Sequence, residues 1–182
     1  IYAEAIRRGV TRAAQVIVLG DGAHWIWGIA EEHFYGAIQI VDLYHAREHL
    51  ALIANLVYGT GTIKSKEWME ARREQLDAGD VEAVIACVRR LRPSHAKVQE
   101  EVRTAADYFH RNAQRMRYAE FRKQGLFVGS GVMEAGCKTI CGQRLKRSGM
   151  HWTVKGANAI IALRCCQLSS RWEEFWEARA LG

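Results

Sequence analysis

Asp21 is the residue of this 182-residue chain with the clearest potential for chemistry. It follows the apolar run VIVLG at 16–20, whose β-branched residues and final glycine are typical of a buried strand. Ligands of open α/β sheets bind beyond the carboxyl ends of the strands, so this carboxylate would lie outside the core on rigid backbone. The alternative is an N-cap or turn residue for the next helix. GDG at 20–22 is not a phosphate-binding loop, because neither GxGxxG nor GxxxxGKS/T is present.

Two histidines follow the next apolar run. Asp42 and His45 stand at its end, and His49 lies one helical turn after His45. Histidines at i and i+4 can bind zinc, but HAREH lacks the glutamate that directly follows the first histidine of HExxH. A surface or capping histidine pair is therefore the favoured interpretation.

A second carboxylate, Glu134, lies in GSGVMEAGCKTICGQRLKRSGMHW (129–152), at the predicted start of a helix. Either it forms an ordinary salt bridge with Lys138 at i+4, or it binds a metal beside a phosphate-binding surface. Basic residues far outnumber acidic ones between Arg111 and Arg147, and the whole chain has a net charge of +6. An anionic partner is expected, with a solvated basic helix face as the alternative.

Apolar spacing predicts the elements that would position these residues. The expected order is helix 2–14 (interrupted around Gly9), strand 16–20, helix 23–34, strand 37–43 and helix 44–58. Two nearly continuous apolar strands joined by a helix form a βαβ unit with parallel strands. Two such strands are too few for a stable sheet, so we expect further strands from upstream sequence or from a partner.

The remainder of the chain is predicted to be helical, with a single proline, Pro93. The expected helices are 65–77, 80–91, 94–124, 132–147, 153–168 and 170–179. The third of these carries an apolar stripe, made of Val98, Val102, Ala105, Phe109 and Met116.

Composition is that of a soluble globular protein, with 49% hydrophobic and 25% charged residues. We expect neither a membrane span nor a signal peptide. The five cysteines form no disulfide framework and favour a reducing compartment, so we expect a cytoplasmic protein. Cys137 and Cys141 lie one helical turn apart and are expected to be small buried thiols rather than a metal pair. Trp25, Trp27 and Trp152 are expected to be core or packing residues rather than platforms for base stacking.

Two long stretches resemble transposases of the Asp-Asp-Glu type. VIVLGDGAHWIWGIAEEHFYGAIQIVDLYHAREHL resembles the second-Asp region of Mutator-like and related bacterial insertion-sequence transposases, most closely the Kra-type insertion sequences. The stretch at 129–152 is similar to the third-carboxylate region of the same group, and the two occur in the correct order. One departure is Tyr35, where the family has the proline of PGA.

The resemblance implies an α/β fold: the C-terminal part of a ribonuclease H-like core with a large all-helical insertion. Residues 1–49 would be the second half of that core, 50–125 the insertion, and 126–182 the final core helix with Glu134 and further helices. The family's first Asp would lie upstream of Ile1, and Asp42 matches no member of the triad. The isolated polypeptide is therefore expected to be inactive.

The same resemblance implies metal-dependent DNA cleavage and strand transfer. Three carboxylates, with Asp21 and Glu134 among them, would bind two Mg²⁺ or Mn²⁺ ions. The partners would be transposon ends and target DNA, with a homo-oligomer as the active complex. His45 is a possible auxiliary residue, and the expected phosphate contacts are Lys138, Arg144, Lys146 and Arg147.

Two other functions remain as alternatives. One is a non-catalytic basic helical remnant that binds nucleic acid, which DNA binding without nicking would support. The other is a small nucleotide-binding domain using GDG, which tight nucleotide binding would support.

Overall fold

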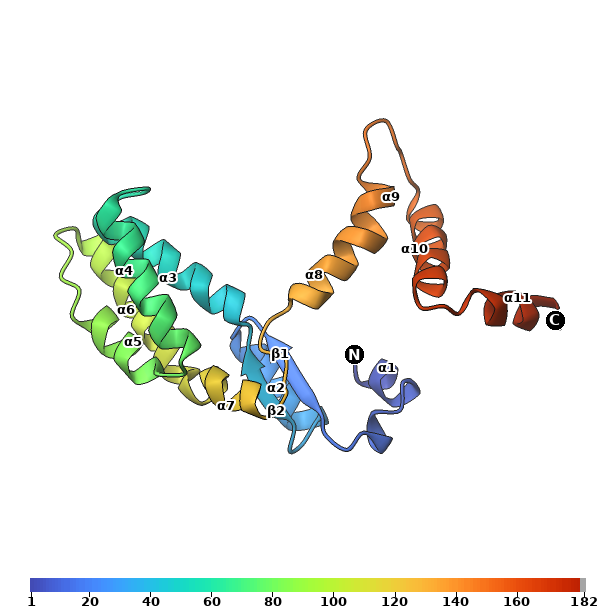
Figure 1. Ribbon diagram of the computed structural model, residues 1–182, viewed down its shortest axis with the longest axis horizontal. Coiled ribbons are helices and arrows are strands. Elements are labelled where there is room, and N and C mark those ends of the chain that lie inside the picture. The colour runs from blue at the N-terminus through green and yellow to red at the C-terminus, as the bar shows by residue number, and fades with distance from the viewer. Residues whose placement is uncertain (181–182) are drawn as a thin grey trace. The chain divides into compact units, whose positions relative to one another are not determined.

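The computed structural model describes residues 1–180, apart from the side chain of Val132, and divides the chain into two compact units. The first unit is Ile1–Ser130 and the second is Gly131–Gly182. Figure 1 labels their elements. No helix in the described residues is long and apolar enough to cross a bilayer.

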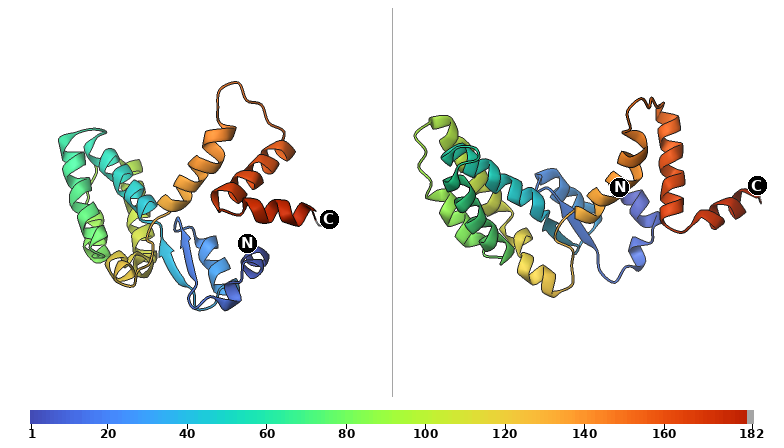
Figure 2. Two further views of the ribbon diagram at one scale, coloured as in Figure 1. Left: turned by 45° about the vertical axis from the view of Figure 1, so that its right-hand side comes forward. Right: turned by 45° about the horizontal axis from the view of Figure 1, so that its top comes forward.

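The first unit begins with the predicted βαβ arrangement. Strands β1 (Ile17–Gly20) and β2 (Ile38–Val41) are joined by helix α2 (His24–His33). The strands pair in parallel, with Ile17 opposite Ile38 and Gly20 opposite Val41. Figure 2 shows α2 beside the two strands. The strand–helix–strand prediction is thus confirmed, and the predicted parallel pairing follows from the helical crossover.

The predicted N-terminal helix is interrupted at Gly9, as expected. Helix α1 (Tyr2–Arg7) and the 3₁₀ helix η1 (Val10–Arg12) lie on either side of this residue. Gly9 has φ 84°, a left-handed conformation that glycine adopts without steric cost.

Helices make up the rest of the first unit. They are α3 (Leu43–Tyr58), α4 (Ile63–Asp77), α5 (Val81–Arg89), α6 (Ala96–Arg111), the 3₁₀ helix η2 (Ala113–Met116) and α7 (Tyr118–Lys123). The prediction of one helix over 94–124 is wrong, because the chain leaves helical geometry at Asn112 and Arg117. The buried Asn112 donates from its Nδ2 atom to the carbonyl oxygen of Tyr108 (3.1 Å), and such local side-chain bonds to the backbone compete with a regular helix.

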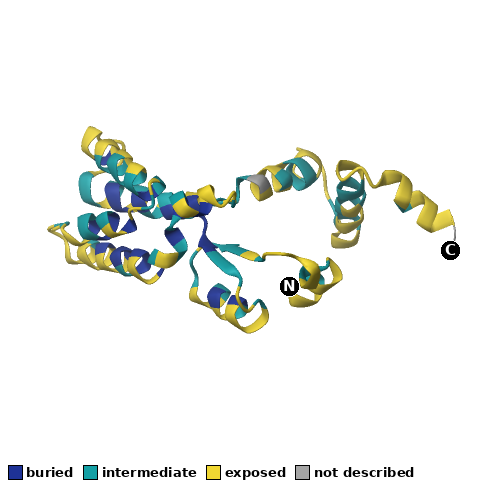
Figure 3. Ribbon diagram, turned by 60° about the horizontal axis from the view of Figure 1, so that its bottom comes forward, coloured by how far each residue is buried: buried dark blue, intermediate teal, exposed yellow. Residues whose placement is uncertain are grey.

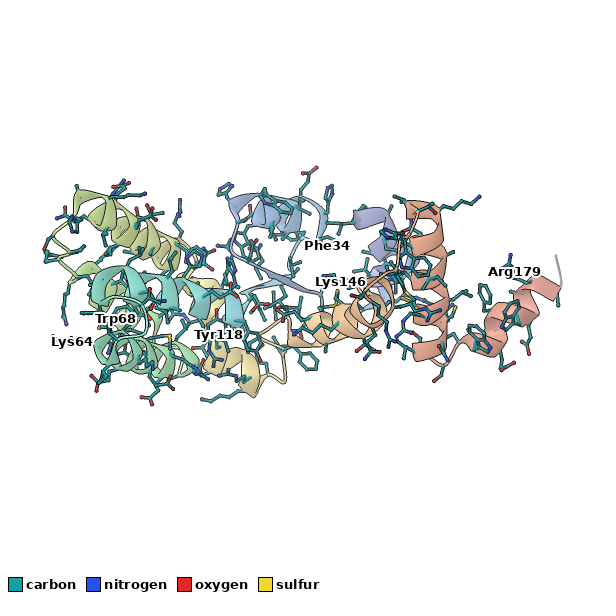
Figure 4. The ribbon with its side chains drawn as sticks, turned by 90° about the horizontal axis from the view of Figure 1, so that it is seen from above. Phe34, Lys64, Trp68, Tyr118, Lys146 and Arg179 are labelled. Atoms are coloured by element: carbon teal, nitrogen blue, oxygen red, sulfur yellow. The ribbon has the colours of Figure 1, made fainter. Side chains whose placement is uncertain are left out.

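One hydrophobic core joins the strands to these helices. Residues from 1–49 and from 50–125, which the resemblance assigns to different domains, pack in the same cluster. The apolar stripe of α6 and η2 is buried, except for the half-buried Val98. Figure 3 shows the buried residues along these elements, and Tyr118, labelled in Figure 4, is fully buried among them. Trp27 is buried as predicted, whereas Trp25 is 63% exposed and lies outside the core.

The second unit contains helices only, among its described residues. They are α8 (Gly131–Cys137), the π-helical segment η3 (Lys138–Gly142), α9 (Gln143–Leu145), α10 (Val154–Leu168) and α11 (Trp172–Ala180). None of its residues with described burial is fully buried. Arg164 of α10 donates to the carbonyl oxygens of Thr139 (2.7 Å) and Ile140 (2.9 Å), so hydrogen bonds connect α10 to the π-helical segment.

The cysteines follow the sequence analysis in part. All five are free thiols, in agreement with the absence of a disulfide framework. Cys141 is half-buried, but the expectation of a buried thiol is wrong for Cys137, which is exposed. The half-buried Trp152 has an indole N–H with no hydrogen-bond partner in the described part of the chain.

Asp42 connects the strands to α3 and to the segment before the second unit. Its Oδ1 atom accepts from the backbone N–H groups of Tyr44 (2.8 Å) and His45 (3.3 Å), which makes it the N-cap of α3. Its Oδ2 atom accepts from Ser130 N–H at 2.7 Å. Asp42 is buried, so both carboxylate oxygens serve the fold.

Replacing Asp42 tests this role. We expect Asp42→Ala to lower the free energy of unfolding by about 2–4 kcal/mol, since it removes a cap and leaves a buried N–H without an acceptor. Asp80→Ala is the matched control, because Asp80 caps α5 through one exposed bond to Ala83 N–H (3.0 Å) and its loss should cost only about 1 kcal/mol. Urea denaturation measures both. Equal losses would contradict the role assigned to Asp42.

Candidate active site

Asp21 follows the carboxyl end of β1, and its side chain is exposed. Its Oδ1 atom accepts from Ala23 N–H at 2.8 Å, which closes a short side-chain-to-backbone turn. Ala23, not Asp21, is the N-cap of α2. The N-cap interpretation of Asp21 is therefore wrong, whereas the turn interpretation describes this bond correctly.

A polar cavity of about 590 Å³ opens beside Asp21. Its walls come from the β1–α2 turn, α2, the first turns of α3 and the end of α6 with η2. Ionisable side chains of both signs line it: Asp21, Glu31, His24, His45, His49, Tyr108, Arg111 and Arg115. The cavity thus places the carboxylate of Asp21, at a strand end, among several basic side chains.

Tyr108 of α6 contacts the GDG turn directly. Its hydroxyl donates to the carbonyl oxygen of Asp21 at 2.9 Å. Burial raises the pKa of Tyr108, and the nearby carboxylates of Asp21 and Asp42 raise it further, so the hydroxyl remains a donor at neutral pH. Gly22 lies against the ring with φ 95°, and a Cβ atom there would be 2.6 Å from Tyr108 Cε2.

Asn112 fixes the opposite side of the same turn. Its Oδ1 atom accepts from Trp27 Nε1–H at 3.0 Å, and both residues are buried. Its Nδ2 atom donates to the carbonyl oxygens of Tyr108 (3.1 Å) and Gly22 (3.5 Å). The end of α6 is therefore bonded both to the turn that carries Asp21 and to α2.

Arg115 lines the cavity and contacts residues of both α2 and β2. Its guanidinium carbon lies 4.8 Å from the centre of the Trp27 ring, and its Nε donates to Gln39 Oε1 at 2.7 Å. Burial lowers the pKa of Arg115, while Glu31, 3.8 Å away, opposes that shift. Arg115 is thus already engaged by the protein, and Arg111 is the exposed guanidinium at the rim.

The histidine pair lies along the cavity wall. The rings of His45 and His49 are 5.0 Å apart, and His49 stacks on Tyr108 at 4.0 Å with an interplanar angle of 24°. Burial lowers the pKa of His49, as does the neighbouring His45, so His49 is neutral at pH 7. Nδ1 of His45 lies 3.2 Å from Glu48. His49 therefore packs as an uncharged aromatic ring.

The other predicted site residues belong to the second unit. Glu134 is exposed on α8. The four basic residues predicted to contact phosphates are also exposed, and Arg147 Nε donates to Gln143 O at 2.7 Å. Lys138 lies on η3 and Arg144 on α9. Lys146, labelled in Figure 4, and Arg147 directly follow α9.

Asp21 is suited to a divalent cation as a single ligand. It offers an exposed hard oxygen donor whose orientation a backbone N–H fixes. Within the described part of the chain, no group of three or more His, Cys, Asp or Glu side chains is arranged to hold a metal ion. Asp42 is not suited, because both of its oxygens accept backbone N–H groups.

Comparisons with models of known protein families, with curated proteins and with solved structures give no match for this chain.

Gly22 provides a test of the turn. We expect Gly22→Ala to lower the free energy of unfolding by about 2 kcal/mol or more, because the left-handed φ and the Tyr108 ring both oppose a Cβ atom. Gly28→Ala is the control, since Gly28 is exposed within α2 and a Cβ there meets no atom within 4 Å. That change should stabilise the chain by up to about 1 kcal/mol. Thermal unfolding of both variants measures these changes. A Gly22→Ala variant as stable as the unmodified chain would contradict the described packing.

Proposed function

We propose that this chain is part of a DNA transposase of the Asp-Asp-Glu type, with Asp21 as one of its catalytic carboxylates. The supporting observation is the position of Asp21. An exposed carboxylate follows the carboxyl end of a parallel strand, at the rim of a polar cavity with basic residues in its wall. The two-stranded parallel unit is compatible with a ribonuclease H-like core, which forms part of the proposal.

Glu134 would be the third carboxylate of the triad, in the same metal site of the complete enzyme. When bound, two Mg²⁺ or Mn²⁺ ions would activate water or a DNA 3′-hydroxyl and stabilise the leaving oxygen in an in-line phosphodiester displacement. The part of Asp21 is to present an oxygen in a fixed direction, since Ala23 N–H holds its Oδ1 atom. The basic residues of the cavity would reduce the repulsion between this carboxylate and the DNA backbone.

The remaining catalytic Asp would come from an additional strand in a longer form of the protein. An apolar groove of about 470 Å³ supports this part of the proposal. It is lined by apolar residues of β1 and α2, such as Ile17 and Ile26, and also by Ala5 of α1 and Val10 of η1. Ile17 is 41% exposed, so this side of β1 has apolar surface that further sheet structure would cover.

The central experiment uses the protein encoded by the whole open reading frame that contains residues 1–182. We expect Mn²⁺-dependent nicking of DNA carrying the terminal repeats, and a loss of roughly two orders of magnitude or more in Asp21→Asn and Glu134→Gln. Glu32→Gln is the control, because Glu32 is exposed on α2 outside the cavity lining. Nicking that survives Asp21→Asn would overturn the proposed role of Asp21.

A second candidate function is nucleic-acid binding without catalysis. The exposed basic residues of η3 and α9 favour it, because phosphate contacts need no metal. In that case the protein encoded by the full reading frame would bind the same DNA but would never nick it.

Both functions predict that the basic residues bind phosphate. We expect the double variant Lys146→Gln/Arg147→Gln to reduce the slope of log affinity against log salt by about 2, roughly 0.9 for each lost phosphate contact. Lys64→Gln/Lys66→Gln is the matched control on α4, where both lysines are exposed (Figure 4 labels Lys64), and should leave the slope unchanged. Fluorescence anisotropy at several salt concentrations gives the slopes, and equal slopes for both variants would exclude this surface.

A further inference from the structure

Helix α6 reaches the turn of Asp21 from a distant part of the chain. Tyr108 and Asp21 are 87 positions apart, yet the hydroxyl of Tyr108 donates to the Asp21 carbonyl oxygen at 2.9 Å. The bond is partly buried, because Tyr108 is only 9% exposed whereas Asp21 is exposed. A partly buried hydrogen bond to the backbone fixes a turn more firmly than a fully exposed one.

The Tyr108 ring is itself held by its surroundings. On one side it contacts Gly22, leaving no room for a Cβ atom. It also stacks on His49 of α3 at 4.0 Å and meets Phe109 edge-on at 5.3 Å. The hydroxyl therefore has little freedom to follow the turn if the turn moves.

Asn112 adds a second connection one helical turn later. Its buried side chain bonds to Trp27 and, more weakly, to the carbonyl oxygen of Gly22. The carbonyl oxygens of Asp21 and Gly22 thus accept from Tyr108 of α6 and from Asn112, its C-cap residue. The carboxylate, in turn, is fixed by Ala23 N–H.

We propose that Tyr108, supported by Asn112, is a positioning residue that sets the direction of the Asp21 carboxylate. Tyr108 acts through the backbone of Asp21 and touches no reacting group, so it is not a catalytic residue. The helices between β2 and the second unit would then have a task in the active site, since α6 holds the metal-binding turn in place. The metal-related part of this inference rests on the proposed function, whereas the control of the turn by Tyr108 does not.

Amide hydrogen exchange measured by NMR on the ¹⁵N-labelled chain tests the control of the turn. The Ala23 amide reports the bond to Asp21 Oδ1, and Tyr108→Phe removes one hydroxyl while keeping the ring. We expect Ala23 to exchange roughly three- to tenfold faster in this variant, as the loss of one partly buried hydrogen bond implies. Tyr118→Phe is a matched control, because Tyr118 is fully buried and its hydroxyl has no hydrogen-bond partner in the described residues. In Tyr118→Phe, the Ala23 amide should exchange at the same rate as in the unmodified chain.

A Mn²⁺ titration of the same samples tests the consequence for the carboxylate. Mn²⁺ should broaden the amide signals of residues 21–23, with a midpoint at least roughly twofold higher in Tyr108→Phe, because the ligand is less well oriented. Unchanged Ala23 exchange would overturn the inference, and faster exchange with an unchanged Mn²⁺ midpoint would reduce Tyr108 to a structural residue. If the unmodified chain shows no broadening at Asp21 while Tyr108→Phe still speeds exchange, the metal site fails and the control of the turn stands.

Discussion

The parallel pairing of β1 and β2 is the constraint on which the rest of the structure depends. Because the strands run in the same direction, Gly20 and Val41 lie side by side and the residues after them, Asp21 and Asp42, emerge at the same edge. The two carboxylates then have different surroundings. Asp42 is buried and accepts three backbone N–H groups, whereas Asp21 is exposed and accepts one. One aspartate serves the fold, and the other is available to a ligand.

The sequence predicts much of this arrangement because the signals are local. Apolar runs ending in glycine identify β1, and the spacing of apolar residues identifies the crossover helix and the stripe of α6. Asp21 can be proposed as a site residue from the sequence because it directly follows the apolar run of β1. The resemblance to transposases suggests a function that the composition does not determine, and that function stays a proposal.

Other features depend on contacts between distant parts of the chain. The helix predicted over 94–124 ends at Arg111, and the next residue, Asn112, bonds to Trp27, 85 positions away. Nothing local distinguishes Tyr108 from an ordinary aromatic residue on the buried side of a helix. Its role appears only when α6 lies against the Asp21 turn. Likewise, the alternation of Trp25 outside and Trp27 inside follows from how α2 packs, and apolar character alone does not predict it.

The most direct test of the central claim is anomalous diffraction from crystals of the protein encoded by the full reading frame, grown with Mn²⁺. The account predicts a Mn²⁺ peak at about 2.1 Å from a carboxylate oxygen of Asp21, with Glu134 as a ligand of the same site. A fully formed structure with Mn²⁺ bound elsewhere, or with Asp21 and Glu134 too far apart to share an ion, would contradict it.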